Sequence, residues 1–252
     1  ASSAFLAMAM ARYDIPVFLA EKPDLLSRPP MALVTNALEA VRNHFRYEDL
    51  FSCLKTGLAG LDWDEIDKLE NYVLTWNIRG GAWEREWTEH PDGYGLSIDE
   101  NAKAQLAELN TLRKRAIAPF SALREALSGE QPAGDCVRAL YAFLLAVDAP
   151  QRMIDRAAGH EQAGRLQLAD EYRQLWEILV SAMEQFAWVC GDMPLTLDRF
   201  AQLFRLVLGE YDVGTIPVSL DRVTCGNIER ACTENAKYVI LLGVNDGLIP
   251  KT

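Results

Sequence analysis

Aromatic and basic side chains are the ones in this chain that could support chemistry on nucleic acid. One region around Arg79 contains four of the six tryptophans, namely Trp63, Trp76, Trp83 and Trp87. Indole rings and a guanidinium group can stack on the bases of a single strand. Tryptophans can instead anchor the core of a small subdomain. The acidic side chains around these tryptophans favour the core, and base stacking is the alternative.

The run Arg113-Lys114-Arg115 is the only basic cluster in the sequence. Three adjacent cations could meet a phosphate group. A charge run on a helix is more often a solvated face, and we expect that role here.

Motifs for nucleotide, metal or nucleophile chemistry are missing from the sequence. There is no G-x-x-x-x-G-K-[ST] segment that would cradle phosphates. The three histidines, His44, His90 and His160, lie far apart and lack partners at metal-ligand spacing. Neither a G-x-S-x-G elbow nor a Cys–His signature occurs. We therefore expect no catalytic residue, cofactor site or metal site in this chain.

The five cysteines and the hydropathy pattern bear on the cellular compartment. No C-x-x-C pair occurs, and we expect buried thiols in a reducing cytoplasm. No apolar run approaches the ~20 residues that a membrane-spanning helix needs.

Acidic side chains dominate the middle of the chain. The net charge is −11, and residues 61–210, with 15 basic and 25 acidic side chains, carry −10 of it. Such a surface repels phosphates and lowers affinity for DNA. Any contact with DNA should therefore be local, weak and near the ends of the chain.

Apolar residues at helical spacing predict a helical middle between two short strands. We expect helices after Pro29-Pro30, over 47–56, 64–76, 97–127 and 161–189, around 137–149, and from Thr196 to Leu208. The long helix should start at a capping box of Ser97 and Glu100, and Pro119 should kink or split it. Strands are expected at 15–19 and from Val223.

The segment from Val223 to Pro250 is expected to contain a second strand. Tyr238–Leu242 is an unbroken apolar run, which suits a strand that is covered on both faces in a parallel sheet. The loop Gly243-Val-Asn-Asp-Gly247 would follow its carboxyl end, where such sheets place functional loops.

Three segments carry a resemblance to a known family. GNIER, followed after a spacer by YVILLGVNDGLIP, resembles motif V of superfamily 1 helicases in the form found in AddB/RexB. That protein is the B subunit of the bacterial ATP-dependent helicase–nuclease. Residues 12–18 resemble the strand after motif IV, and residues 45–57 resemble the start of the 2B insertion. The middle of the chain matches only by position.

The resemblance implies a mainly α fold with a small α/β part. A helical 2B-like domain, residues 46–209, would be inserted into an incomplete RecA-like domain 2A. Residues 1–45 and 210–252 would form domain 2A, and the second of these segments would contain a degenerate motif V.

The resemblance also implies which residues face DNA. Active helicases of this superfamily carry T-x-H-x-x-K-G-L-E in motif V, whereas this chain has Cys225-Gly-Asn-Ile-Glu-Arg230 and lacks the Lys-Gly step. This departure favours holding or scanning a single strand over driving its movement. The implied DNA-side residues are Asn227 and Arg230, with Lys55 and Thr56 as weaker candidates. Alternatively, Asn227 and Arg230 only stabilise the turn between strands.

The implied function is DNA double-strand-break end processing and recombinational repair with an AddA-type helicase–nuclease partner and DNA. The ATP, Mg and iron–sulfur sites of the family would lie outside this chain. A module that docks the partner protein without touching DNA is a second hypothesis. A complete UvrD-like motor fragment is a third, and the degenerate motif V argues against it.

Overall fold

The computed structural model describes residues 2–13, 15, 17–20, 25–211, 223–226 and 237–241. Contacts divide the chain into two compact units. The first combines Ala1–Pro23 with Ile216–Thr252, and the second is Asp24–Thr215. In the sequence, the second unit is therefore inserted between the two halves of the first.

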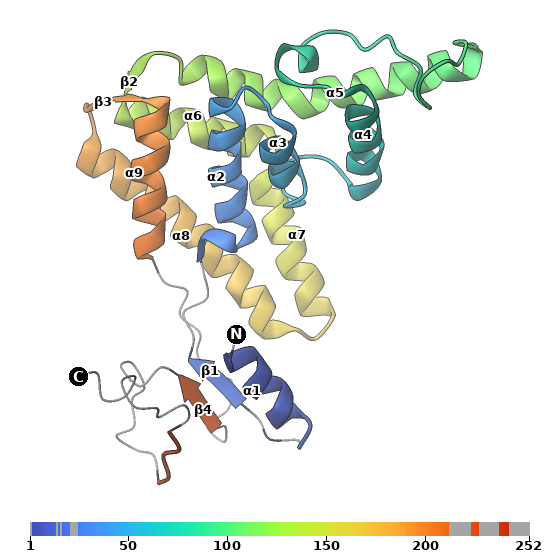
Figure 1. The fold of residues 1–252 in the computed structure, drawn as a ribbon. Helices are drawn as coiled ribbons and strands as arrows, with labels where there is room; N and C mark the ends of the chain where they lie inside the picture. Colours follow the sequence, from blue (N-terminus) through green and yellow to red (C-terminus); the bar gives the residue numbers. More distant parts are fainter. Residues whose placement is uncertain are drawn as a thin grey trace, which may run out of the picture. The chain divides into compact units, whose positions relative to one another are not determined.

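The second unit is helical (Figure 1). Two short 3-10 helices, η1 (Leu25–Ser27) and η2 (Gly80–Trp83), accompany an antiparallel pair of strands, β2 (Glu130–Pro132) and β3 (Pro194–Thr196). The α-helices described in this unit are α2 (Pro29–Arg42), α3 (Tyr47–Leu54), α4 (Trp63–Trp76), α5 (Glu100–Ala126), α6 (Ala133–Ala146), α7 (Ala149–Gln162), α8 (Leu166–Cys190) and α9 (Leu197–Glu210).

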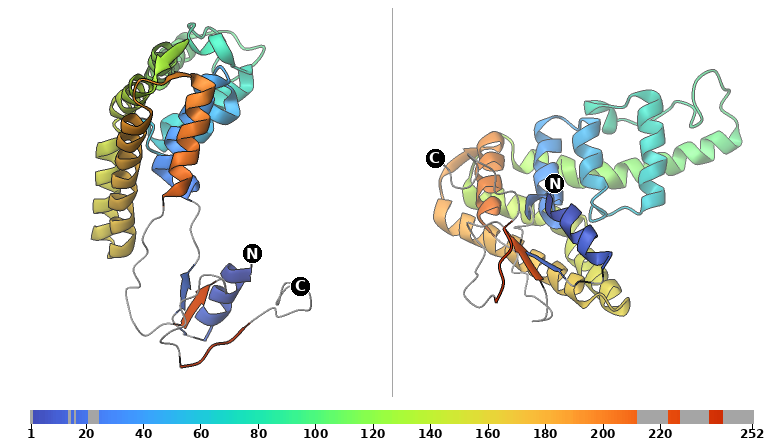
Figure 2. Two further views of the ribbon diagram at one scale, coloured as in Figure 1. Left: turned by 90° about the vertical axis from the view of Figure 1, so that its left-hand side faces the viewer. Right: turned by 60° about the horizontal axis from the view of Figure 1, so that its bottom comes forward.

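Helix α2 lies at the centre of the helical unit, where α3, α5, α8 and α9 pack around it (Figures 1 and 2). It starts at Pro29-Pro30, where the missing amide protons cost nothing, and its apolar side chains are buried over most of its surface. Each large apolar side chain buried in this way contributes about 1.5–3 kcal/mol before conformational entropy is subtracted. The helical unit consequently begins at Asp24, earlier than the expected residue 46.

Helix α5 differs from the expected long helix at two places. The expected capping box at Ser97 and Glu100 is wrong: Asp99 is the N-cap, and its carboxylate accepts a hydrogen bond of 2.8 Å from Ala102 N. Pro119 lies inside one continuous helix and does not split it. Buried neighbours such as Ile117 and Phe120 hold both sides of the proline in the core, which offsets the lost hydrogen bond.

Helix α7 differs from the sequence-based expectation, in which one helix ends near Ala149-Pro150 and the next begins near Glu161. Pro150 instead occupies the first turn of a new helix, a position that suits proline. Asp148, with φ at +57°, makes the break between α6 and α7. Helices α7 and α8 then pack side by side across a short connection (Figure 1).

The α/β unit contains α1 (Ser2–Ala11) and a parallel pair of strands, β1 (Val17–Ala20) and β4 (Val223–Gly226). The register runs from Val17 opposite Val223 to Ala20 opposite Gly226. The two strands confirm the expectation of strands near residues 15–19 and from Val223. The mainly α fold with a small α/β part is confirmed as well.

The predicted strand at Tyr238–Leu242 is wrong for its described residues, 238–241. These residues form no strand, and Tyr238 and Ile240 are 90% and 81% exposed. A strand buried on both faces needs neighbouring strands and covering layers, and the described part of this unit has only the β1–β4 pair. The loop at 243–247 lies outside the described residues.

Candidate functional site

Lys55, an expected DNA-side residue, lies directly after α3, where Glu70 holds its ammonium group. Lys55 Nζ donates to Glu70 Oε1 at 2.6 Å, and Tyr47 Oη donates to the same oxygen at 2.7 Å. The hydrogen bond to Glu70 raises the pKa of Lys55. Burial raises the pKa of Glu70, but the bonds from Lys55 and Tyr47 outweigh it, and the pKa is lowered overall. The ammonium group is therefore already paired inside the helical unit.

Thr56 ends helix α3 through its hydroxyl group. Oγ1 donates to Cys53 O at 2.7 Å and accepts from Leu58 N at 3.2 Å. Gly57, with φ at +69°, then turns the chain away from the helix. The Thr56 side chain thus has a structural use at this helix end.

Arg79 lies on the surface between α4 and η2. Its side chain is exposed, and within the described residues it makes no ion pair and no side-chain hydrogen bond. Arg79 is thus available to an outside group. Asn227 and Arg230, the other two expected DNA-side residues, lie outside the described residues.

Two of the four tryptophans, Trp83 and Trp87, lie in a core, as the favoured interpretation predicts, whereas Trp76 is half-buried and Trp63 is 55% exposed. Trp83 is fully buried, and Trp87 is 4% exposed and stacked on Tyr72 with ring centroids 4.6 Å apart. Asn110 pairs with the backbone of Trp87: Trp87 N donates to Oδ1 at 2.9 Å, and Nδ2 donates to Trp87 O at 2.8 Å. Neither ring can stack on a base.

Arg113 is buried, so the expectation of a solvated basic run is wrong for this residue. Its guanidinium donates to Asn110 Oδ1 at 3.0 Å and to Trp83 O at 2.6 Å. Burial lowers its pKa. Arg115 pairs with Glu65, and Lys114 is exposed. The missed signal is that Asn110 and Arg113 are three residues apart, on the face of α5 that Leu109 and Leu112 also bury.

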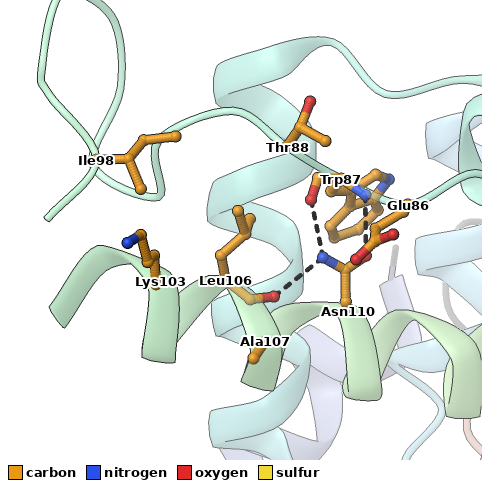
Figure 3. A pocket seen from close by; sticks show the side chains of 8 residues that line it. All are labelled: Glu86, Trp87, Thr88, Ile98, Lys103, Leu106, Ala107 and Asn110. Carbon is orange, nitrogen blue, oxygen red and sulfur yellow. Dashed lines mark hydrogen bonds between the residues drawn. The ribbon is translucent and has the colours of Figure 1, made fainter. Parts of the chain in front are cut away.

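A shallow hollow of about 310 Å³ lies beside the Asn110–Trp87 pair (Figure 3). Asn110 Nδ2 also donates to Leu106 O at 3.1 Å, so both ends of the amide are used within the protein. The wall that Asn110 contributes therefore offers no free polar group to a ligand.

A larger hollow, of about 520 Å³, lies between the α3–α4 connection and α7. We call it the Trp63 hollow, because the Trp63 side chain, 55% exposed, is its aromatic wall. Its remaining walls combine both signs of charge and are Gly57, Leu61, Asp62, Asp64, Arg152, Asp155 and Arg156. No sequence pattern indicated this hollow, because three of its residues lie on the unexpected helix α7.

Negative charge is concentrated in the helical unit. Residues 24–215 hold 19 basic and 30 acidic side chains, so this unit carries the whole net charge of −11. Ten of the 19 basic side chains form ion pairs, and Arg113 is buried. The other eight basic side chains are outnumbered by the 30 acidic ones, so the helical unit as a whole repels a polyanion.

Cysteines and potential metal ligands show no cluster in the described part of the chain. Cys53 and Cys136 are buried, Cys190 and Cys225 are half-buried, and all four are free thiols. Burial raises the pKa of the Cys53 thiol. No three His, Cys, Asp or Glu side chains among the described residues come together as a metal site. Within the same residues, no helix is long and apolar enough to cross a membrane.

The fold defines a class of protein: an acidic helical unit inserted, in sequence, between two parallel strands. No family model matches the chain. The B subunit of the ATP-dependent helicase/deoxyribonuclease of Acetivibrio thermocellus is 35% identical over 244 residues, which are 95% of this chain and 21% of that protein. Proteins of the same name from Clostridioides difficile and Clostridium botulinum (strain Loch Maree) are 33% and 31% identical over 94% and 99% of this chain.

These similarities confirm the family resemblance. Along nearly its whole length, the chain is homologous to part of the B subunits of ATP-dependent helicase/deoxyribonucleases. It spans about a fifth of the length of the curated relatives that it matches, 21% in each case.

Proposed function

We propose that this chain is part of the B subunit of a helicase/deoxyribonuclease that acts in DNA double-strand-break end processing and recombinational repair. Within it, the α/β unit would belong to helicase domain 2A, and the helical unit would be its 2B-like insertion. The observation that carries this assignment is the parallel pairing of β1 with β4 across an inserted unit of residues 24–215. The names of the relatives support the helicase and nuclease context.

In this proposal, the α/β unit holds or scans single-stranded DNA. In the sequence, Asn227 follows β4 directly and Arg230 comes three residues later, and side chains of these types suit phosphate oxygens and base edges. The charge distribution supports a DNA contact in the α/β unit, because this unit is electrically neutral whereas the helical unit carries a net charge of −11. An AddA-type partner would supply the motor, and the ATP, Mg and iron–sulfur sites would lie elsewhere in the complex.

Fluorescence anisotropy of a labelled oligonucleotide tests the DNA role on the full chain. We expect weak binding at 50 mM salt, because few phosphates are neutralised, and a further loss of affinity of about tenfold at 200 mM, because each neutralised phosphate releases a counterion. Arg230→Ala should weaken binding about fivefold. Lys114→Ala removes the same charge from an exposed site on α5 and should have no effect. Nanomolar binding that resists salt, or equal effects of the two variants, contradicts the proposal.

A second candidate function is a module that docks the partner helicase protein without touching DNA. The acidity of the helical unit and the ion pairing of its cations favour it. The two functions give different results in one pair of assays. A docking module gives no anisotropy change with DNA at 50 mM salt and still forms a complex with the partner protein.

A further inference from the structure

The Trp63 hollow has no part in the proposed DNA role, yet it leaves a large indole ring open to solvent. Trp63 begins α4 and is 55% exposed, whereas Trp83 and Trp87 in the same region are buried. Large aromatic side chains that stay exposed beside arginines are typical of the anchoring residues of protein interfaces. The hollow therefore has the composition of a docking site.

Both arginines of the hollow are already used by the protein. Arg152 Nη1 donates to Leu61 O at 3.3 Å and lies 3.8 Å from Asp62 Oδ1. Arg156 Nη1 donates to Tyr172 Oη at 3.4 Å. The guanidinium of Arg156 also packs against Gly57 so closely that a Cβ at that position would collide with it. The two cations thus form part of the wall.

Two carboxylates of the hollow, Asp64 and Asp155, form no ion pair among the residues that the structure describes. Within the same residues, Asp155 accepts only the amide of Gln151, at 2.8 Å. The negative charge of the helical unit adds to their potential. The face of the Trp63 ring attracts cations as well. The hollow has three carboxylates against two guanidinium groups, so this excess of negative charge and the ring together favour a cation over a phosphate.

We propose that the Trp63 hollow docks a protein partner by a lysine or arginine side chain. The aliphatic stem of that side chain lies on the Trp63 indole, and its cation meets Asp64 and Asp155. This inference does not rest on the proposed DNA role, because it uses residues of the helical unit alone. The complementary partner surface is basic, opposite to the charge of residues 24–215.

NMR spectra of the full chain with ¹⁵N-labelled tryptophan test this docking site, since each indole N–H gives its own signal and Trp63→Phe identifies that of Trp63. The probes are acetyl-Gly-Arg-Gly-amide, its Lys and Glu counterparts, and a ten-nucleotide oligothymidylate. We expect the Arg and Lys peptides to shift the Trp63 signal saturably, with millimolar affinity, and the Glu peptide to leave it unchanged. Trp188, which is 86% exposed outside the hollow, is the reference signal in the same spectrum.

Two matched double variants separate the effect of the hollow's own carboxylates from that of the protein's net charge. Asp64→Asn/Asp155→Asn should weaken the Arg peptide about five- to tenfold. Asp92→Asn/Asp192→Asn removes the same charge from exposed sites outside the hollow and should leave the affinity unchanged. Any of three results overturns the inference: no saturable shift at Trp63, an equal shift at Trp188, or equal effects of the two double variants. Tighter binding of the oligothymidylate overturns it in favour of a nucleic-acid site.

Discussion

Replacing Asn110 by alanine should destabilise the helical unit more than any surface change on the same helix. Asn110 is 7% exposed and joins helix α5 to the segment around Trp87 through its amide. It accepts from Trp87 N at 2.9 Å and from Arg113 Nε at 3.0 Å, and it donates to Trp87 O at 2.8 Å. Its removal leaves these buried groups without their partner.

The magnitude follows from the cost of buried polar groups that lose a partner. Each such group costs about 1–3 kcal/mol, and the guanidinium is at the upper end of that range. The costs of three groups in one network do not simply add, so we expect Asn110→Ala to lower the free energy of unfolding by about 3–5 kcal/mol. Asn101→Ala, on the exposed first turn of α5, should change it by less than about 0.5 kcal/mol.

Urea unfolding followed by tryptophan fluorescence measures the stability of both variants. Hydrogen exchange at the Trp87 amide locates the effect, because that amide loses its acceptor only in Asn110→Ala. A loss of stability equal to that of Asn101→Ala, or unchanged protection of the Trp87 amide, would refute the reasoning that this network holds the tryptophan region together.

Two further predictions concern a helix end and a buried phenol. Gly57→Ala should lower the free energy of unfolding by about 1–2 kcal/mol, because a left-handed backbone disfavours alanine and the new methyl group would displace Arg156. Gly81→Ala is the matched control, since no atom lies near the added carbon. Equal urea midpoints for the two variants contradict the account. Burial raises the pKa of Tyr72 to about 12. The unfolded chain therefore releases this proton at lower pH than the folded protein does, and stability should fall as pH rises from about 10 to 12. Tyr72→Phe should lose less stability over that pH range than the wild type does. Tyr94→Phe, at a site 74% exposed, should behave as the wild type. Unfolding midpoints at pH 9 and 11.5 measure this difference, and an identical pH dependence of all three proteins contradicts the prediction.

The helical elements could be predicted where one apolar face follows helical spacing, as in α2, α4 and α9. Helix α7 could not, because its mean hydropathy is low and because Pro150, a residue that often ends a helix, here lies in the first turn of one. The strand at Tyr238–Leu242 failed for another reason. An apolar run specifies burial, and burial depends on neighbouring strands that the run itself does not encode.

For the functional residues too, the residue type could be predicted from the sequence, but the surroundings of the side chain could not. Residue type suggested Lys55 as a DNA-side residue, but only the fold shows that Glu70 holds its ammonium group. Similarly, three adjacent basic residues suggested a solvated face. Arg113 instead lies on the side of α5 that faces the core, whereas Lys114 lies on the exposed side. The Trp63 hollow needs two elements far apart in sequence, the α3–α4 connection and α7, so no local pattern could reveal it.

Hydrogen–deuterium exchange of the full chain, with and without a single-stranded oligonucleotide at concentrations above its dissociation constant, tests the central claim most directly. The central claim is that the α/β unit contacts DNA and that the acidic helical unit does not. The account predicts that DNA slows exchange in peptides from residues 216–252 and leaves peptides from residues 24–215 unchanged. Protection by DNA within residues 24–215, with none in residues 216–252, would contradict it.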